Sequence, residues 1–202
     1  MNPYSTIQSR LGLSQPLPYT LDWSAAPDFI GLIVDYALQA KPGVIVECSS
    51  GLTTLALARC CQINQRGRVI SLENGEEYAE QTRQQLQAFG LEDYAQVIYA
   101  PLQQVSLDRD YDWYSLESLP EVPIDMLVID GPPGFLQKNS RYPSLPLLFD
   151  RLSESCSVFL DDAARDDERE LVAQWLIEYP GLQHAYHDFE RGCSVLKINK
   201  GR

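Results

Sequence analysis

The chain has 202 residues, which is the length of a single α/β domain and too short for two full catalytic domains. Hydrophobic residues make up 45% and charged residues 22%, so the chain can bury a core without disulfide or metal support. Sixteen Lys and Arg against 28 Asp and Glu give a formal net charge of -12. This charge disfavours nucleic acid as a partner and favours a small molecule, while a homodimer stays open.

The number and spacing of the cysteines favour a reducing compartment. Their number is odd, two are adjacent, and no C-x-x-C motif occurs, which argues against a disulfide framework and a zinc site. No window of 18 apolar residues occurs, and the N-terminus lacks a basic head followed by an apolar stretch. We therefore expect reduced thiols, a cytoplasmic location and no membrane partner.

The first 22 residues are rich in Pro and Gly and are expected to form an irregular N-terminal arm (1–22). Residues 23–202 are expected to form one domain. At its start, Ser24 is a candidate N-cap for a helix whose apolar positions from Phe29 to Leu38 recur at helical spacing, and Pro42-Gly43 ends that helix.

Short apolar runs then alternate with helical stretches. Strands are expected over 44–48, 68–72, 96–100, 124–130 and 157–161, and helices over 53–61, 76–89, 145–152 and around 171–179. Nearly all residues of these runs are apolar, as in strands covered on both faces. Segments 182–188 and 193–198 are too close for a crossover helix and predict an antiparallel hairpin. The fold class is α/β: a doubly wound, mostly parallel seven-stranded sheet with helices on both faces.

Ligands of open α/β sheets bind beyond the carboxyl ends of the strands, and four predicted strand ends carry acids. These acids are Glu47, Glu73, Asp130, Asp161 and Asp162. A carboxylate at the end of a buried strand costs several kcal/mol, roughly, unless it has a partner, so ligand binding is the favoured interpretation. Glu47 merely bracing its loop, and Asp130 merely organising its Gly-Pro-Pro turn, are the alternatives.

The loop after the first strand has the features of a cofactor site. Ser49, Ser50 and Gly51 form a tight turn before a helix starting near Thr53, and such a turn exposes N–H groups. Glu73 is placed to accept hydrogen bonds from a ribose diol. The G-x-G-x-x-G of nicotinamide dinucleotide sites is missing, and Glu47 suits an ammonium group. S-adenosylmethionine, with an ammonium, a ribose and a sulfonium, meets these needs.

The stretch from Val44 through Gly51 to Ala56, together with Val69 to Glu73 and the terminal hairpin, resembles the class I S-adenosylmethionine-dependent methyltransferases. The resemblance covers 23–198 and implies their Rossmann-like fold, with Ser49 standing where a glycine is usual. It implies a list of cofactor-binding residues: Trp23, Ser24, Glu47, Ser49, Ser50, Gly51, Thr53, Glu73, Asn74, Ala100, Pro101, Leu102 and Asp130.

Ile129-Asp130-Gly-Pro-Pro-Gly and Leu160-Asp161-Asp162 are most similar to the small O-methyltransferase branch that includes the catechol and caffeoyl-coenzyme A enzymes. That similarity implies Mg²⁺ held by Asp130, Asp161 and Asp162. Asp162 replaces the branch's usual Asn, and no lysine follows Asp130 at the position of its catalytic one. Both Asp161 and Asp162 could instead cap the helix that begins near Arg165.

The expected chemistry is in-line attack of a substrate oxygen on the sulfonium methyl. Asp130 is the first candidate for base or metal ligand, and Arg141 is a candidate for recognising an anionic or phenolic group, followed by Arg165. The acids from Asp166 to Glu170 are expected to be a solvated helix start.

The sequence therefore predicts a methyltransferase that methylates an oxygen of a small molecule. Two alternatives stay open: a module that binds S-adenosylmethionine or S-adenosylhomocysteine (SAH) without catalysis, and an NAD-dependent oxidoreductase on a similar sheet.

Overall fold

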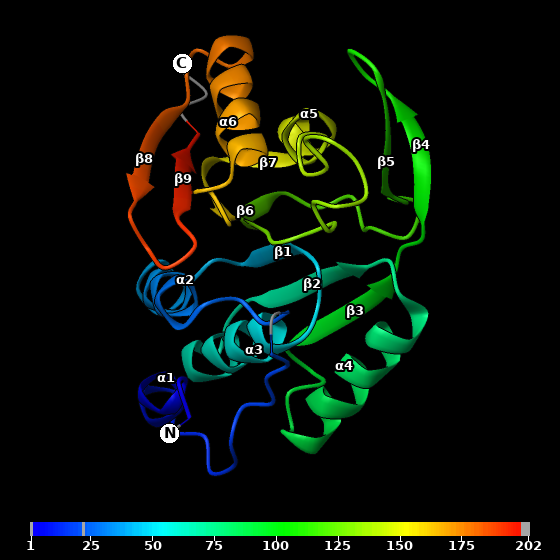
Figure 1. The fold of residues 1–202 in the computed structure, drawn as a ribbon. Coiled ribbons are helices and arrows are strands. Elements are labelled where there is room, and N and C mark those ends of the chain that lie inside the picture. Colours follow the sequence, from blue (N-terminus) through cyan, green and yellow to red (C-terminus); the bar gives the residue numbers. More distant parts are fainter. Residues whose placement is uncertain (1, 22, 199–202) are drawn as a thin grey trace.

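A computed structural model describes residues 2–21 and 23–198, so the expected boundary at residue 22 and the end at 202 lie outside the described part. Seven strands form one sheet in the order β3-β2-β1-β6-β7-β9-β8 (Figure 1). Their bounds are β1 Val44–Cys48, β2 Arg68–Glu73, β3 Ala95–Tyr99, β6 Ile124–Ile129, β7 Leu152–Asp161, β8 Gln183–His187 and β9 Cys193–Lys197.

Strand pairing follows the predicted topology. β1 lies parallel between β2 and β6, with Val46 opposite both Ile70 and Leu127. β9 is antiparallel to both β7 and β8, so Val195 lies opposite Phe159 and Ala185. The parallel sheet and the C-terminal antiparallel hairpin are confirmed.

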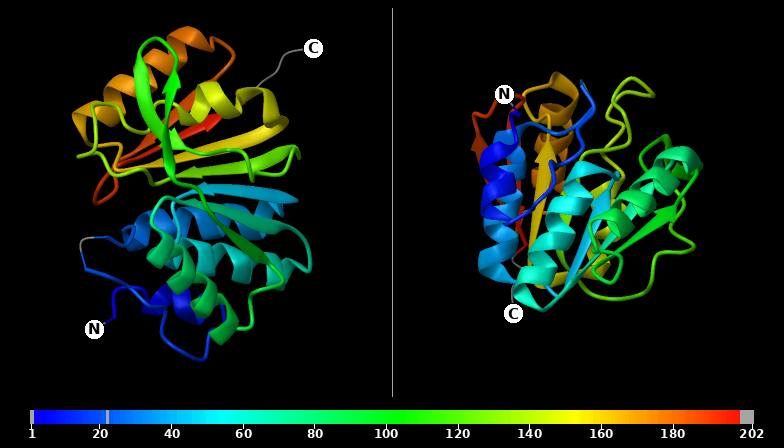
Figure 2. Two further views of the ribbon diagram at one scale, coloured as in Figure 1. Left: turned by 90° about the vertical axis from the view of Figure 1, so that its right-hand side faces the viewer. Right: turned by 90° about the horizontal axis from the view of Figure 1, so that it is seen from below.

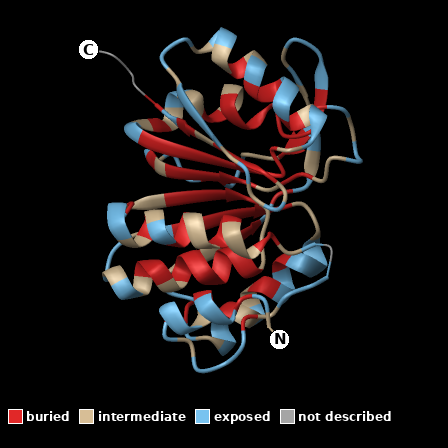
Figure 3. Ribbon diagram, turned by 60° about the vertical axis from the view of Figure 1, so that its left-hand side comes forward, coloured by how far each residue is buried: buried red, intermediate tan, exposed pale blue. Residues whose placement is uncertain are grey.

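Helices cover both faces of the sheet (Figures 1 and 2). One face carries α1 Ser5–Arg10, α2 Pro27–Ala40, α3 Leu52–Asn64 and α4 Glu76–Ala88. The other carries α5 Ser144–Leu148, the 3₁₀ turn Phe149–Arg151, α6 Asp166–Glu178 and the hairpin of β4 Leu102–Ser106 and β5 Asp110–Tyr114. Strand residues alternate between two hydrophobic clusters, one under each layer, and the central strands β1 and β6 are buried at all but one residue each (Figure 3).

No helix in the described ranges is long and apolar enough to span a membrane.

The N-terminal arm departs from the expectation of an irregular segment, because it contains α1 and packs on the core. Tyr4, Ile7, Leu11 and Leu17 are buried. The Tyr4 hydroxyl donates a hydrogen bond to the carbonyl of Ala25 over 2.8 Å. Pro and Gly content therefore marked the turns of this segment correctly, but its four buried apolar side chains were overlooked.

One further local expectation was wrong. Ser24 does not cap α2, whose N-cap is Ala26 and makes no side-chain hydrogen bond; Pro27 stands at the first helical position instead.

The connection between β3 and β6 contains the β4–β5 hairpin, which was not predicted. Tyr111, Trp113 and Tyr114 of β5 are buried against the sheet, which alternation around Asp112 could have indicated.

We predict that Leu11→Ala lowers the free energy of unfolding by about 2–5 kcal/mol, because Leu11 is 1% exposed and its loss leaves a cavity beneath the arm. Urea titration followed by circular dichroism measures the change. Leu21→Ala is the matched control, since Leu21 is 75% exposed and should be nearly neutral. Equal effects for the two variants would contradict a structural role for the arm.

Candidate functional site

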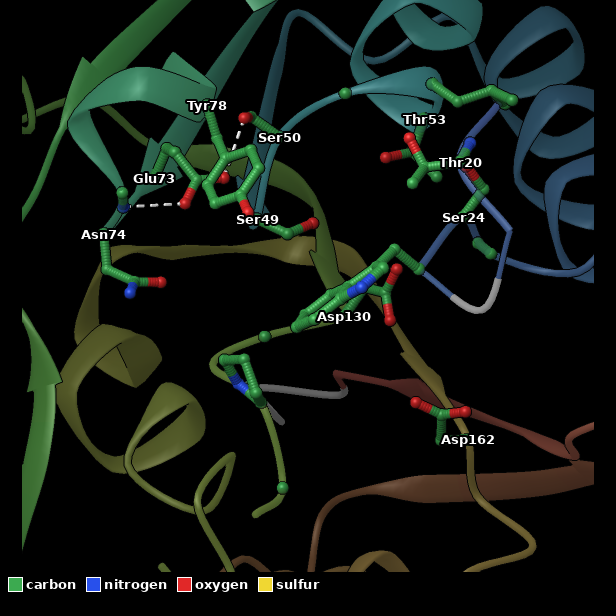
Figure 4. A pocket seen from close by; sticks show the side chains of 18 of the residues that line it. Thr20, Ser24, Ser49, Ser50, Thr53, Glu73, Asn74, Tyr78, Asp130 and Asp162 are labelled. Carbon is green, nitrogen blue, oxygen red and sulfur yellow. Dashed lines mark hydrogen bonds between the residues drawn. The ribbon is translucent and has the colours of Figure 1, made fainter. Parts of the chain in front are cut away.

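A cavity of about 1040 Å³ opens at the carboxyl ends of β1, β2 and β6 (Figure 4). Residues 18–20 and 23–25 of the N-terminal segment, one face of α4, residues 133–136 of the loop after β6 and the start of α6 enclose its other sides. Sites for small molecules typically measure roughly 300–1,000 Å³, so this one has room for a cofactor and a second ligand.

The turn between β1 and α3 forms one wall of the cavity. Ser49 and Gly51 have φ angles of 142° and 125°, in the region that favours glycine. This backbone directs the N-terminus of α3, with its unpaired N–H groups and its partial positive charge, toward the cavity. The turn is therefore suited to an anionic group such as a carboxylate.

Glu47 lies behind this turn and is fully buried. Its carboxylate accepts hydrogen bonds from the hydroxyls of Thr53, of Thr54 at 2.6 Å and of Ser71 at 2.7 Å. Burial raises the pKa of Glu47, and the three hydroxyl donors oppose that rise. Glu47 does not line the cavity, so in this structure it braces the turn and holds Thr53, which does.

Glu73 ends β2 beside the same turn. One carboxylate oxygen accepts a hydrogen bond from Ser50 at 2.8 Å and the other from the Gly75 N–H at 2.9 Å, so the side chain is held in place (Figure 4). Both Glu73 and Asn74 line the cavity. A fixed carboxylate with remaining lone pairs is the arrangement that a vicinal diol requires.

Asp130 stands at the end of β6, on the opposite side of the cavity from Glu73 (Figure 4). The next residue, Gly131, is needed for close approach, because a Cβ there would lie 2.3 Å from the Tyr114 hydroxyl. Tyr114 is buried, and burial raises the pKa of its hydroxyl well above the usual value. A neutral phenol therefore stands next to Asp130 on the cavity wall.

The Arg141 guanidinium lies among acidic side chains and is 3% exposed. Its Nη2 lies 2.8 Å from Asp162 Oδ2 and 3.4 Å from Asp130 Oδ1, and its Nε lies 3.8 Å from Glu168. Arg165 also pairs with Asp162, at 2.9 Å. This Arg–Asp cluster joins the end of β6, the end of β7 and the start of α6.

The three predicted metal ligands converge: Asp130, Asp161 and Asp162 each offer an oxygen within 4.8 Å of the others. Both carboxylate oxygens of Asp161 are buried without a hydrogen-bond partner. Burial, reinforced by the charges of Asp130 and Asp162, raises the pKa of Asp161 to about 8. Burial likewise raises the pKa of Asp130, to about 7, against the lowering effect of Arg141.

Most of the predicted site residues meet in one cavity. Those that line it are Trp23, Ser24, Ser49, Ser50, Gly51, Thr53, Glu73, Asn74, Asp130, Arg141 and Asp162. Those that do not are Glu47, Ala100, Pro101, Leu102 and Asp161. Ala100 is buried, with its N–H donating to the Glu73 carbonyl, and Leu102 begins the β4–β5 hairpin. Adenine contact at Ala100 to Leu102 therefore stays a prediction without support from the cavity.

One wall of the cavity consists of residues that were not predicted from the sequence. Tyr78, Gln81, Thr82 and Gln85 of α4 line it at i, i+3, i+4 and i+7. That spacing identifies a single helix face and could have been found from the sequence. Phe135, at the mouth of the cavity, was not predicted either: it meets the predicted Trp23 edge to face, with ring centroids 6.4 Å apart.

The start of α6 corrects two expectations. The helix begins after Arg165 as N-cap, without a side-chain capping bond, so capping by Asp161 or Asp162 is wrong. Glu168 is 2% exposed, near Arg141 and Arg165, and is not part of a solvated helix start. A buried cation attracts this carboxylate into the protein, and such a tertiary pairing has no signature in the local sequence.

We predict that Ser49→Gly raises the free energy of unfolding by about 1 kcal/mol, since glycine adopts this φ freely. The variant also removes a buried hydroxyl that has no hydrogen-bond partner. Thermal unfolding checks the sign. Ser50→Gly is the contrasting variant. It removes the hydrogen bond from Ser50 to Glu73 and should therefore lower the melting temperature. A lower melting temperature for Ser49→Gly would contradict this account.

Residues 46–163, more than half of the chain, match the protein family described as "Methyltransferase domain". No curated protein matches the chain. Many solved structures are similar to this chain, and three that cover nearly all of it illustrate the likeness. An SAH-bound methyltransferase from Podospora anserina has a TM-score of 0.70 and 15% identity, and covers 99% of this chain and 89% of its own. An O-methyltransferase from Bacillus cereus in complex with SAH has a TM-score of 0.67 and 14% identity, and the match covers 98% of this chain and 91% of the Bacillus cereus chain.

The O-methyltransferase TomG from Streptomyces achromogenes, in complex with SAM, has a TM-score of 0.64 and 12% identity, over 97% of this chain and 87% of its own. At these identities the structures establish the shared fold, the Rossmann-like methyltransferase fold that the sequence predicted. The family match, made on sequence, covers the β1–α3 turn, Glu73 and the Arg–Asp cluster up to Ala163. The chain belongs to the methyltransferase-domain family.

Proposed function

We propose that this protein is an S-adenosylmethionine-dependent methyltransferase that transfers the methyl group to an oxygen of a small molecule. The observation that carries the proposal is the placement of Glu73 beside the N-terminus of α3 in one large cavity. Three similar structures are described as methyltransferases with SAH or SAM bound, which supports the same ligand here.

The residues of the β1, β2 and α4 walls fit this cofactor. The α3 N-terminus suits a carboxylate, and the Glu73 carboxylate suits the ribose hydroxyls. The exposed ring of Tyr78, on the α4 wall, offers a flat surface to a base. No glycine-rich G-x-G-x-x-G loop is present for a pyrophosphate, which together with the family match disfavours the nicotinamide alternative.

We assign the acceptor to the part of the cavity between Asp130 and the mouth formed by Trp23 and Phe135. Aromatic side chains at the mouth favour a compact acceptor with an apolar body. The formal net charge of -12 disfavours a nucleic-acid acceptor. Four buried, free cysteines, Cys48, Cys60, Cys61 and Cys193, support a reducing, cytoplasmic location.

In the proposed reaction, Asp130 accepts the proton of the acceptor hydroxyl. Its raised pKa of about 7 makes it a stronger base than an exposed aspartate. When bound, S-adenosylmethionine supplies a sulfonium-bound methyl, whose bond to sulfur breaks as the bond to the acceptor oxygen forms. The electron pair stays on sulfur, so the products are a methyl ether, SAH and protonated Asp130. Tyr114 and Gly131 keep this side of the cavity closely packed.

Binding of SAH tests the cofactor. We predict that isothermal titration shows micromolar binding of SAH, no comparable binding of NAD, and a loss of about tenfold or more for Glu73→Ala, because a charged acceptor of ribose hydroxyls is removed. Glu77→Ala, an exposed acid on the first turn of α4, is the matched control and should bind SAH normally.

Absence of SAH binding to the folded wild-type protein would reject the proposal. Unchanged affinity in Glu73→Ala would reject the ribose assignment alone, provided that circular dichroism shows the variant to be folded.

The role of Asp130 has a separate test. With an acceptor found by screening small phenols and hydroxy acids, we predict that Asp130→Asn lowers the rate of methyl transfer by about 100-fold or more while SAH still binds. Asp150→Asn, an exposed acid outside the cavity, serves as the control. Full activity in Asp130→Asn would exclude Asp130 as the base. SAH binding without turnover on any acceptor would favour the non-catalytic module instead.

A further inference from the structure

The Arg–Asp cluster contains the three carboxylates that a divalent metal would use, but a cation of the protein is already among them. Nη2 of Arg141 contacts Asp162 at 2.8 Å and Asp130 at 3.4 Å. Asp162 Oδ2 is also paired with Arg165 at 2.9 Å. Two of the three prospective ligands therefore already face guanidinium groups.

Hydrogen bonds to the backbone fix the Arg141 guanidinium in the cluster. Besides the acids, its Nη1 donates to the carbonyl of Asp161 and its Nη2 to the carbonyl of Asp130, each over 2.9 Å. The side chain is 3% exposed. Removing it to admit a metal would break these bonds and would require a new place for a buried charge. Keeping it would place a divalent ion within a few ångströms of a positive charge in a poorly solvated site.

Three cations of the protein already surround the acids of the cluster. Besides Arg141, Arg165 lies 2.9 Å from Asp162 and 4.0 Å from Glu168, and Arg191 lies 4.0 Å from Asp162. A divalent ion placed among these acids would be repelled by three guanidinium groups. The residues present thus do not fit a divalent metal.

We propose that the Arg141 guanidinium takes the place of the divalent metal, so that this protein binds no metal at the Arg–Asp cluster and needs none for methyl transfer. The inference deepens the proposed function and rests on it for the last clause only. Arg141 is a positioning residue: it fixes the Asp130 carboxylate through a side-chain contact and a backbone carbonyl, and thereby orients the base toward the acceptor. Its permanently positive guanidinium group has enough donors to hold several acceptors at once.

The test is metal binding by the purified full-length protein, measured by electron paramagnetic resonance during titration with Mn²⁺. We expect no binding by the wild type up to millimolar Mn²⁺, and no change in its melting temperature or SAH affinity with EDTA or Mg²⁺. Arg141→Gln leaves the carboxylates without their cation and should tighten Mn²⁺ binding by about tenfold or more. Arg165→Gln removes a cation from Asp162 while leaving Arg141 in place, and should not create the site.

Micromolar Mn²⁺ binding by the wild type would overturn the inference, and so would a folded Arg141→Gln variant that gains no Mn²⁺ affinity. If Arg141→Gln does not fold, Arg141→Lys and the wild-type titration still decide, because a retained positive charge must keep Mn²⁺ out. These readouts do not depend on SAH. Failure to bind SAH rejects the proposed function, whereas Mn²⁺ binding rejects the metal-free site.

Discussion

The carboxyl edge of the sheet depends on one buried cation. A guanidinium that is 3% exposed loses its hydration, and several kcal/mol, roughly, must be recovered from charged partners and hydrogen bonds. Arg141 recovers this from the end of β6, the end of β7 and Glu168 on α6. Because its partners come from separate elements, their relative positions are tied together. Arg141 thus cross-links the cavity wall around Asp130.

The opposite wall shows a different solution to the same problem. Glu47 is as deeply buried as Arg141, but hydroxyls rather than charges surround it. Three donors offset part of its desolvation and connect β1, β2 and α3 behind the turn. Glu47 thus supports the backbone of the turn, while its contact with an ammonium group stays a prediction. Thr53 and Ser50 form the cavity surface on this side. Thr53 donates a hydrogen bond to Glu47, and Ser50 donates one to Glu73.

The sequence predicted features that depend on local pattern or on topology. Short apolar runs rich in β-branched residues and followed by turn residues, such as Val44–Cys48, predict buried strands, and acids after such strands meet at one edge of a parallel sheet. Interactions between distant segments were beyond this reasoning. Arg141 follows a loop without periodicity, so nothing local indicates that it turns back beneath Asp130. Glu168 looked like an ordinary acid of a helix start, because its burial depends on a cation 27 positions earlier in the chain.

The proposed reaction removes charge from the cavity. A carboxylate at Asp130 and a sulfonium are both charged before methyl transfer, whereas a protonated Asp130 and a thioether are both neutral after it. Burial disfavours charge, so the desolvation that raises the pKa of Asp130 also favours the direction of transfer. Arg141 acts against this effect, because it stabilises the carboxylate form. Its single charge at 3.4 Å from Asp130 is weaker than that of a divalent ion would be, so Asp130 stays ionised enough to accept a proton without losing its basicity.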